Sequence, residues 1–313
     1  MNIVITGAAG FIASHLTDHL LSQGHTVTGI DNFLTGSKKN IHHLLSNERY
    51  AFIESDVIDF DYGKIEGVVD IVFHMASPAS PIQYKKYPIE TLEVNSVGTK
   101  QALEFATKKK AVLVYASTSE VYGDPLVHPQ IESYWGNVNP NGVRSCYDEA
   151  KRFGEAMCMS YVRKNKTKVR IARIFNTYGP RMDVNDGRVV SNFIVQAIKN
   201  APITIYGNGQ QTRSFCYVSD LVRGLALLAT KELVAGEVIN LGNPNEMTIK
   251  EIAEKIKELT SSQGQVQLHP IDLDDPQRRK PDITKAQEML GWNPTVSLEE
   301  GLRSTITYFK SIV

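Results

Sequence analysis

Asn2-Ile3-Val4-Ile5-Thr6-Gly7-Ala8-Ala9-Gly10-Phe11-Ile12-Ala13 is an apolar run that leads into a glycine-rich turn. Residues 2–6 predict a short buried strand, and residues 14–23 predict a helix that Gly24 closes. In such a unit Gly7 permits a tight turn, and Gly10 lets backbone amides approach a pyrophosphate at the positive end of the helix. We therefore predict a dinucleotide-binding turn in which Gly7, Gly10, Phe11 and Ile12 contact the cofactor.

An acidic residue follows at the position where an adenosine ribose is expected. The next predicted strand, residues 25–30, ends at Asp31, which lies 31 − 10 = 21 residues after Gly10. A carboxylate there accepts a hydrogen bond from the ribose 2′-hydroxyl and repels a 2′-phosphate. Asp31 thus favours NAD over NADP, and its neighbour Asn32 is included in the predicted cofactor-binding set.

The alternation of strands and helices continues, which predicts an α/β fold with a Rossmann-like, doubly wound parallel sheet. Predicted strands 51–55 and 70–74 end at Asp56-Val57, expected near the adenine, and at Ala76-Ser77, expected beside the pyrophosphate. Loops at the carboxyl ends of parallel strands converge on one crevice. A helix over about 88–107 contributes Asn95 to the cofactor set. His74 is expected to pack within its strand, because no second metal ligand lies nearby.

Ser145-Cys146-Tyr147-Asp148-Glu149-Ala150-Lys151 carries the predicted catalytic chemistry. On a helix, Tyr147 and Lys151 share one face, about one turn apart. A fixed positive charge favours the phenolate and moves the tyrosine pKa down from about 10 toward neutrality. This pair predicts a general base for a sugar or alcohol hydroxyl. The strand over 111–116 delivers a hydroxyl and a carboxylate, in Ser117 to Gly123, to the same edge of the sheet.

Composition limits the possible partners. The 313 residues contain 34 Lys+Arg and 34 Asp+Glu, so no net charge attracts the chain to nucleic acid or to an anionic membrane. The start of the chain has no basic-then-apolar leader, and no apolar run approaches 18 residues, which leads us to expect a soluble, cytoplasmic protein. Three cysteines without paired spacing argue against a disulfide framework or a zinc site, and we expect no metal.

Five stretches together resemble the UDP-glucuronate decarboxylases (UDP-xylose synthases), which are extended short-chain dehydrogenases/reductases of the NAD-dependent epimerase/dehydratase family. The resemblance covers nearly the whole chain. The stretches are Ser117-Thr118-Ser119-Glu120-Val121-Tyr122-Gly123-Asp124-Pro125, Arg144-Ser145-Cys146-Tyr147-Asp148-Glu149-Ala150-Lys151-Arg152, Arg173-Ile174-Phe175-Asn176-Thr177-Tyr178-Gly179-Pro180-Arg181, Asp186-Gly187-Arg188-Val189-Val190-Ser191-Asn192-Phe193 and Asp274-Asp275-Pro276-Gln277-Arg278-Arg279-Lys280-Pro281-Asp282.

The resemblance implies an NAD-binding Rossmann domain over residues 1–179. It also implies a smaller C-terminal α/β lobe over 180–313 that mainly binds the nucleotide sugar, with some chain crossing back. Within this lobe we expect short strands at 203–206, 212–218, 238–241 and 266–269. Three helix starts show a capping-box pattern: Thr248 with Glu251, Thr284 with Gln287, and Ser297 with Glu300. The family usually dimerises through the helix after Asn95 and the helix of Tyr147, so a homodimer is implied.

The same resemblance implies how the reaction runs. Tyr147 would take the O4 proton of UDP-glucuronate as the C4 hydride passes to NAD+, while Lys151 holds the phenolate and the nicotinamide ribose. Thr118 would hydrogen-bond O4. The C4 ketone would then let the C6 carboxylate leave as CO2. Glu120 and Arg279 are the candidates for proton delivery and carboxylate placement, and the sequence does not say which does which.

The resemblance also implies a substrate site. An isolated arginine is usually a surface residue with an ion-pair partner. In the family, however, Asn176, Arg188 and Arg213 fall where the nucleotide diphosphate is held, and Arg279 falls beside the sugar carboxylate. The remaining members of the implied substrate-binding set are Tyr84, Val189, Tyr206, Gln211 and Tyr217.

Three other functions stay open at the level of sequence. A nucleotide-sugar 4,6-dehydratase usually has an aspartate at the place of Ser119, and a serine cannot protonate a leaving hydroxyl as that acid does. A 4-epimerase needs a pocket in which the ketosugar can rotate, and sequence does not reveal pocket volume. A dinucleotide sensor without catalysis is disfavoured by the intact set of Thr118, Tyr147 and Lys151.

Overall fold

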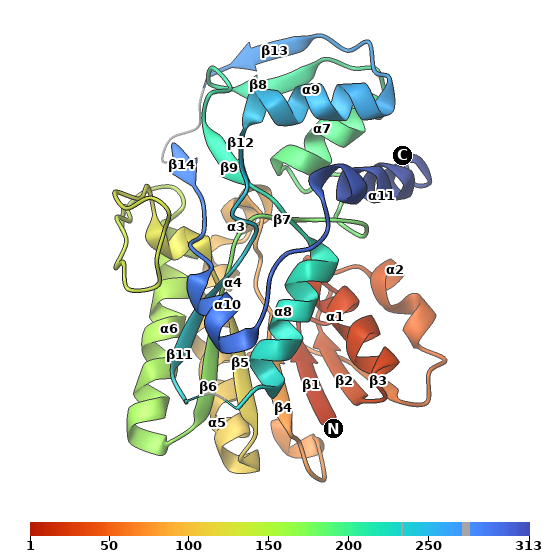
Figure 1. Ribbon diagram of the computed structural model, residues 1–313. Coiled ribbons are helices and arrows are strands. Elements are labelled where there is room, and N and C mark those ends of the chain that lie inside the picture. The colour runs from red at the N-terminus through yellow and green to blue at the C-terminus, as the bar shows by residue number, and fades with distance from the viewer. Residues whose placement is uncertain (233, 271–275) are drawn as a thin grey trace.

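A seven-stranded parallel sheet forms the centre of the computed structural model, which describes residues 1–232, 234–270 and 276–313 (Figure 1). Asp274 and Asp275 of the fifth family-like stretch lie outside the described residues. The strand order is β11-β6-β5-β4-β1-β2-β3, and this confirms the predicted doubly wound α/β fold. The strands are β1 (Asn2–Thr6), β2 (Thr26–Asp31), β3 (Tyr50–Glu54), β4 (Ile71–His74), β5 (Val112–Thr118), β6 (Lys168–Ile174) and β11 (Glu237–Leu241).

Helices cover both faces of this sheet because strand side chains alternate between the faces. Ile3 and Ile5 of β1 share a buried cluster with Leu16 of α1 (Phe11–Ser22) and Leu225 of α8 (Val218–Thr230). Val4, between them, points to the opposite cluster. That second face is covered by the π-helical turn Val94–Gly98, α5 (Thr99–Lys109) and α6 (Ser145–Asn165), and α4 (Pro88–Glu93) packs on α6. The short α2 (Lys38–Ile41) lies beside α1, and α10 (Thr284–Leu290) packs on α8 and β11.

A smaller lobe lies beyond the carboxyl ends of the strands, at the top of Figure 1. Its own core joins residues of three helices, for example Phe193, Ile252 and Phe309. Its helices are α7 (Val189–Ile198), α9 (Ile249–Thr260) and α11 (Leu298–Lys310), and its strands are β8 (Ile203–Tyr206), β9 (Thr212–Ser214), β12 (Glu246–Thr248), β13 (Val266–His269) and β14 (Arg278–Arg279). β7 (Thr177–Tyr178) and β10 (Cys216–Tyr217) pair where the chain enters this lobe.

The chain returns to the main sheet after its first passage through the smaller lobe. β11 pairs in parallel with β6, with Ile239 opposite Ala172. The strand that the sequence predicted at 238–241 therefore belongs to the central sheet. Polypeptide from beyond residue 180 thus builds part of both the sheet and one of its covering layers.

Several predicted elements differ in their bounds. α1 already begins at Phe11, so its first amides lie at the glycine turn. The helix predicted over 88–107 consists of α4, a π-helical turn (Val94–Gly98) and α5, which extends to Lys109. The strand predicted over 212–218 is divided into β9 and β10, and α8 begins at Val218. The remaining short elements are α3 (Pro81–Lys86) and the 3₁₀ turns His42–Leu44, Tyr62–Lys64 and Ser119–Tyr122.

The predicted helix caps have different outcomes. Thr248 and Glu251 form the reciprocal capping box at the start of α9, and the Ser297 side chain accepts from the Glu300 amide at α11. The prediction at Thr284 is wrong, since Thr284 is already helical and its amide donates to Oδ1 of Asp282 instead. Within the described ranges, no helix has the length and apolar character that crossing a membrane requires.

Candidate functional site

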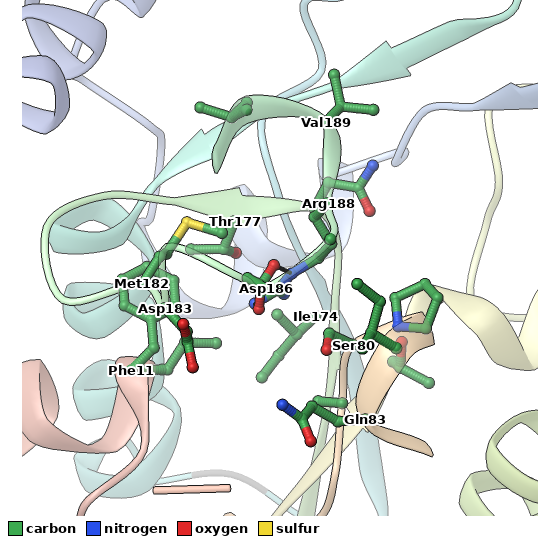
Figure 2. A pocket seen from close by; sticks show the side chains of 18 of the residues that line it. Phe11, Ser80, Gln83, Ile174, Thr177, Met182, Asp183, Asp186, Arg188 and Val189 are labelled. Carbon is green, nitrogen blue, oxygen red and sulfur yellow. Dashed lines mark hydrogen bonds and ion pairs between the residues drawn. The ribbon is translucent and has the colours of Figure 1, made fainter. Parts of the chain in front are cut away.

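A cleft of about 840 Å³ lies between the carboxyl edge of the sheet and the smaller lobe. Both lobes line it, as expected for an α/β sheet that binds ligands where its strand order reverses. Figure 2 shows Arg188 and Asp186 projecting into its middle, with Phe11, Met182 and Asp183 on one side and Ser80 and Gln83 on the other. The cleft therefore joins segments that are up to about 300 residues apart in the chain.

The glycine turn after β1 has the shape that a pyrophosphate requires. Gly7 adopts a left-handed φ of +70°, and a Cβ at this residue would lie 2.8 Å from the backbone of Ala76. No side chain caps α1 at Gly10, and Phe11 and Ile12 line the cleft at this helix end. Because the amides of a helix start carry partial positive charge, the turn fits a dinucleotide phosphate.

A smaller pocket of about 130 Å³ continues from the turn, and Gly7, Gly10 and Ser77 line both spaces. It contains the predicted adenosine-side residues Asp31, Asn32, Asp56, Val57 and Ala76. The two pockets thus adjoin at the glycine turn, with the predicted adenosine-side residues in the smaller one and Tyr147 and Lys151 in the larger.

Asp31 also organises the turn around it. Its two carboxylate oxygens accept from the amide of Ala9 (2.9 Å) and from the amide of Phe33 (2.7 Å). Burial raises the pKa of Asp31 above its usual range, while these two amides oppose the shift. Each oxygen keeps a lone pair that a ribose hydroxyl can use. The neighbouring Asn32 donates to Asp56 (2.7 Å).

Asn95 and His74 act behind the cofactor site and do not line it. Asn95 is fully buried in the π-helical turn and donates to Oγ of Ser77 (2.9 Å), so it positions a residue that faces both pockets. His74 is buried between the hydroxyls of Thr6 and Thr99, and burial lowers its pKa to about 3. His74 is thus the packed strand residue that the sequence predicted.

Tyr147, Lys151 and Thr118 come together at the floor of the cleft. Nζ of Lys151 donates to the carbonyl of Ala116 (2.8 Å). Burial raises the pKa of Tyr147, although its hydrogen bond with Thr118 opposes this. Burial also lowers the pKa of Lys151 to about 7. The predicted lowering of the Tyr147 pKa is wrong for this environment, because it counted the lysine charge and left out the loss of water around both groups.

Glu120 lies beside this set, between two arginines. Oε2 of Glu120 accepts from Arg144 (2.7 Å), and Oε1 accepts from Arg279. Burial alone would raise the pKa of Glu120, but the charges of Arg279 and Arg144 outweigh it and hold the pKa at about 2. Glu120 is therefore a carboxylate at any physiological pH.

Arg144 and Asp148 are site residues that the sequence argument missed. Both lie within the family-like stretch 144–152, four residues apart around the start of α6, but nothing in the sequence indicates which way they point. Asp148 is buried, and its Oδ1 has no hydrogen-bond partner. Burial and the negative charge of Glu120 raise the pKa of Asp148 to about 7 against the opposing charges of Arg144 and Arg279.

The far end of the cleft carries the predicted substrate residues. Arg188 forms a forked ion pair with Asp186 (2.5 and 2.8 Å). Arg213 is buried on β9, and Gln211 donates to the carbonyl of Tyr206 (2.6 Å). Cationic side chains of this kind suit a diphosphate. Asn176, Val189, Tyr206, Gln211 and Arg213 all line the cleft.

Two predicted tyrosines differ in their placement. Tyr84 stacks on Tyr147, with ring centroids 5.0 Å apart and planes 5° apart. Its buried hydroxyl has no partner, like that of Ser80, and both residues line the cleft. Tyr217 does not line the cleft: it packs on Tyr178 and its hydroxyl donates to Ser304 (2.9 Å). The sequence could not reveal this, because residues 216 and 217 form a strand that turns Tyr217 toward α11.

Comparison with known proteins agrees with this site. A chain from Danio rerio, UDP-glucuronic acid decarboxylase 1, is 54% identical over 98% of this chain and 72% of its own length. UDP-glucuronic acid decarboxylase 2 from Arabidopsis thaliana is 51% identical over 100% of this chain and 69% of its own length. Both similarities extend over the cofactor turn, the Tyr147 helix and the smaller lobe.

Solved structures show the same architecture at lower identity. UDP-glucuronic acid 4-epimerase from Bacillus cereus, in complex with UDP-glucuronic acid and NAD, superposes with a TM-score of 0.92 at 32% identity over 100% of both chains. UDP-glucose 4-epimerase from Thermotoga maritima superposes with a TM-score of 0.90 at 31% identity over 99% of both chains. The model of the NAD dependent epimerase/dehydratase family matches residues 3–242. The chain therefore belongs to the NAD dependent epimerase/dehydratase family.

Proposed function

We propose that this protein converts UDP-glucuronate to UDP-xylose and CO2, with NAD as its cofactor and a 4-keto sugar as the intermediate. The observation that carries the proposal is the buried Glu120, held by Arg144 and Arg279 beside Tyr147. An arginine at this place suits a substrate that brings a carboxylate. The identity of 51–54% to two UDP-glucuronic acid decarboxylases supports the same assignment.

The cofactor site fits the proposal. The turn at Gly7 and Gly10 would hold the pyrophosphate, and Asp31 would accept from the adenosine ribose and disfavour a 2′-phosphate. When bound, NAD supplies a hydride acceptor and donor for C4. Ser77 would contact the cofactor where the two pockets join, held in place by Asn95.

Proton transfer at O4 falls to Tyr147 and Thr118. As a phenolate, the tyrosine oxygen would take the O4 proton when C4 is oxidised and return it when C4 is reduced. Because burial raises the pKa of Tyr147, this step requires the positive charges of Lys151 and of bound NAD+ to favour the phenolate. Thr118 already hydrogen-bonds Tyr147, so it can orient the phenol toward O4. Lys151 supplies a positive charge from the same helix face, although burial brings its pKa to about 7.

Carbon loss follows from the ketone. A carboxylate β to a carbonyl can leave as CO2 because the carbonyl oxygen accepts the electrons of the broken bond. C5 must then gain a proton, so each turnover consumes one proton from outside the substrate. Ser119, at the cleft floor, cannot act as the acid that expels a C6 hydroxyl, and this favours decarboxylation over dehydration.

The test is to incubate the purified protein with UDP-glucuronate and NAD+ and to identify products by mass. We expect a nucleotide sugar lighter by CO2. A mass-unchanged product would instead indicate a 4-epimerase, the activity named for the structural neighbours. Tyr147→Phe should keep the fold but lower turnover by roughly a hundred- to ten-thousand-fold, the range for removing a positioned acid–base group.

We also propose a homodimer that uses α4, the π-helical turn and α6. These adjacent elements expose four apolar side chains, Ile89, Leu92, Val97 and Phe153, each at least 41% accessible. A clustered apolar surface on contiguous helices suits a partner of the same kind. Sedimentation of the wild type and of Phe153→Glu would test this, since only the variant should sediment as a monomer.

A further inference from the structure

Two arginines from different lobes of the molecule form ion pairs with Glu120. Arg144 precedes α6 and reaches Oε2 at 2.7 Å, whereas Arg279 belongs to β14 of the smaller lobe and reaches Oε1. The three side chains are between 3% and 14% exposed. Each carboxylate oxygen therefore has its own guanidinium.

Arg279 uses both of its terminal nitrogens in this arrangement, whereas its buried Nε has no hydrogen-bond partner. One terminal nitrogen donates to Glu120, and the other donates to the carbonyl of Gly123 (2.9 Å). If the carboxylate of UDP-glucuronate binds Arg279, as the proposed function requires, it shares the positive charge of that guanidinium with Glu120. Of the two guanidinium groups that hydrogen-bond Glu120, Arg144 would then be the one that the substrate carboxylate does not share.

A buried carboxylate that loses its cation takes up a proton or moves. Either change would remove the negative charge of Glu120 from its place at the moment when the substrate carboxylate is bound. We propose that Arg144 is a positioning residue that holds Glu120 in place and ionised while Arg279 is shared with the C6 carboxylate of the substrate. This inference rests on the proposed function for the identity of that carboxylate.

The charges around Glu120 leave this task to Arg144. Three arginines face Glu120: Arg279 of β14, Arg213 of β9 and Arg144 just before α6. The other titratable groups that face it are Tyr147 and Asp148 at the start of α6 and Tyr84 of α3. Asp148 competes with Glu120 for the same two cations, Arg144 and Arg279. Without Arg144, Glu120 and Asp148 would share Arg279, with Arg213 adding its charge at Glu120, and the substrate would add a third carboxylate.

The direct test is the titration of Glu120 itself. We label the glutamate side-chain carboxyls with 13C and identify the Glu120 signal by its loss in Glu120→Gln. In the wild type this signal should not titrate above about pH 4, because two guanidinium groups favour the carboxylate. In Arg144→Gln the midpoint should rise by about one pH unit or more. Arg144→Lys, which keeps the positive charge but changes the geometry of the donor, should shift the midpoint less.

The sharing of Arg279 between Glu120 and the substrate carboxylate is tested with the same Glu120 signal. These titrations use the Tyr147→Phe variant, because its slow turnover leaves the substrate unconverted. UDP-glucuronate should raise the Glu120 midpoint further in Arg144→Gln, whereas UDP alone should not. With Arg144 present, UDP-glucuronate should leave the midpoint low. The matched control is Arg163→Gln, which removes an exposed arginine from the last turn of the same helix and should behave as the wild type throughout.

An unmoved Glu120 midpoint in Arg144→Gln would overturn the inference, and so would an equal response to UDP and UDP-glucuronate. If Arg144→Gln does not fold, Arg144→Met, which also removes the positive charge, provides the same comparison, and an unmoved midpoint there has the same meaning. The titration of Glu120 in the substrate-free protein does not depend on enzymatic activity. If the wild type releases no CO2 but the Glu120 midpoint still rises in Arg144→Gln, the proposed function is refuted. The role of Arg144 in keeping Glu120 ionised would then still be supported.

Discussion

Asp148 is a residue whose effect on stability should depend on pH. Its pKa in the folded protein is about 7, since burial and Glu120 disfavour its charge, whereas an unfolded aspartate titrates near pH 4. Between these values the folded state keeps a proton that the unfolded chain has released, so stability falls as pH rises through this window. Below about pH 4 and above about pH 7 the contribution of Asp148 is constant.

We expect Asp148→Asn to remove this pH-dependent penalty. Relative to the wild type, the variant should gain stability as pH rises from about 4 to about 7, with each kcal/mol raising the melting temperature by roughly 2–4 °C. Thermal unfolding across this range measures the difference. Asp59→Asn at an exposed site is the control and should give a flat difference. A flat difference for Asp148→Asn as well would mean that Asp148 is already ionised near its ordinary pKa.

At the scale of single residues, the sequence predicted which residues belong to the site better than it predicted which of them contact one another. Gly7, Asp31, Tyr147 and Lys151 could be predicted because their spacing within one βα unit or one helix turn fixes their neighbours. Arg144 could not be placed in the same way, because its partner Glu120 lies 24 residues earlier and the two meet only after β5 and α6 pack together.

At the scale of elements, the turn between β1 and α1 makes a quantitative prediction. Gly7→Ala introduces both a left-handed strain at φ +70° and a Cβ 2.8 Å from the Ala76 backbone. Gly67 has a similar φ of +72° but open space around it. Gly67→Ala should therefore cost about 1 kcal/mol of unfolding free energy for the backbone alone.

Gly7→Ala should cost roughly 1–3 kcal/mol more than that control, because the backbone at Ala76, just after β4, must move away. Since the same turn faces the cofactor site, NAD+ binding should also fall in Gly7→Ala and not in Gly67→Ala. Urea unfolding and calorimetric titration measure the two effects. Equal destabilisation by both substitutions would show that the approach of Ala76 carries no cost.

The elements that the sequence misplaced share one cause. The apolar run at 238–241 has the composition of a strand, but only its pairing with β6 assigns it to the central sheet. Residues 212–218 look continuous, yet β9 pairs with β12 and β14 while β10 pairs with β7. Pairing between distant segments decides both cases, and a local pattern carries no information about it.

At the scale of the whole molecule, the two lobes are interlocked by the path of the chain. α8 and β11 come after the first entry into the smaller lobe, yet they complete the sheet and one of its faces. Leu221, Leu225 and Leu228 of α8 are fully buried in the cluster that also holds Ile3 and Leu16. The cofactor-binding half of the molecule thus depends on residues from the second half of the sequence.

This arrangement predicts that residues 1–179 do not fold alone. Removing α8 uncovers the apolar face of β1 and α1, and each of its three buried leucines contributes about 1.5–3 kcal/mol of burial. We expect the fragment to aggregate or to unfold without cooperativity.

Co-expression with residues 180–313 should restore a soluble complex with a cooperative melt, since the missing strand and helix are then supplied in trans. Circular dichroism during heating distinguishes these states. A soluble 1–179 fragment that melts cooperatively by itself would show that the sheet does not need α8 and β11, and that the interlocked path of the chain adds no stability to the cofactor-binding half.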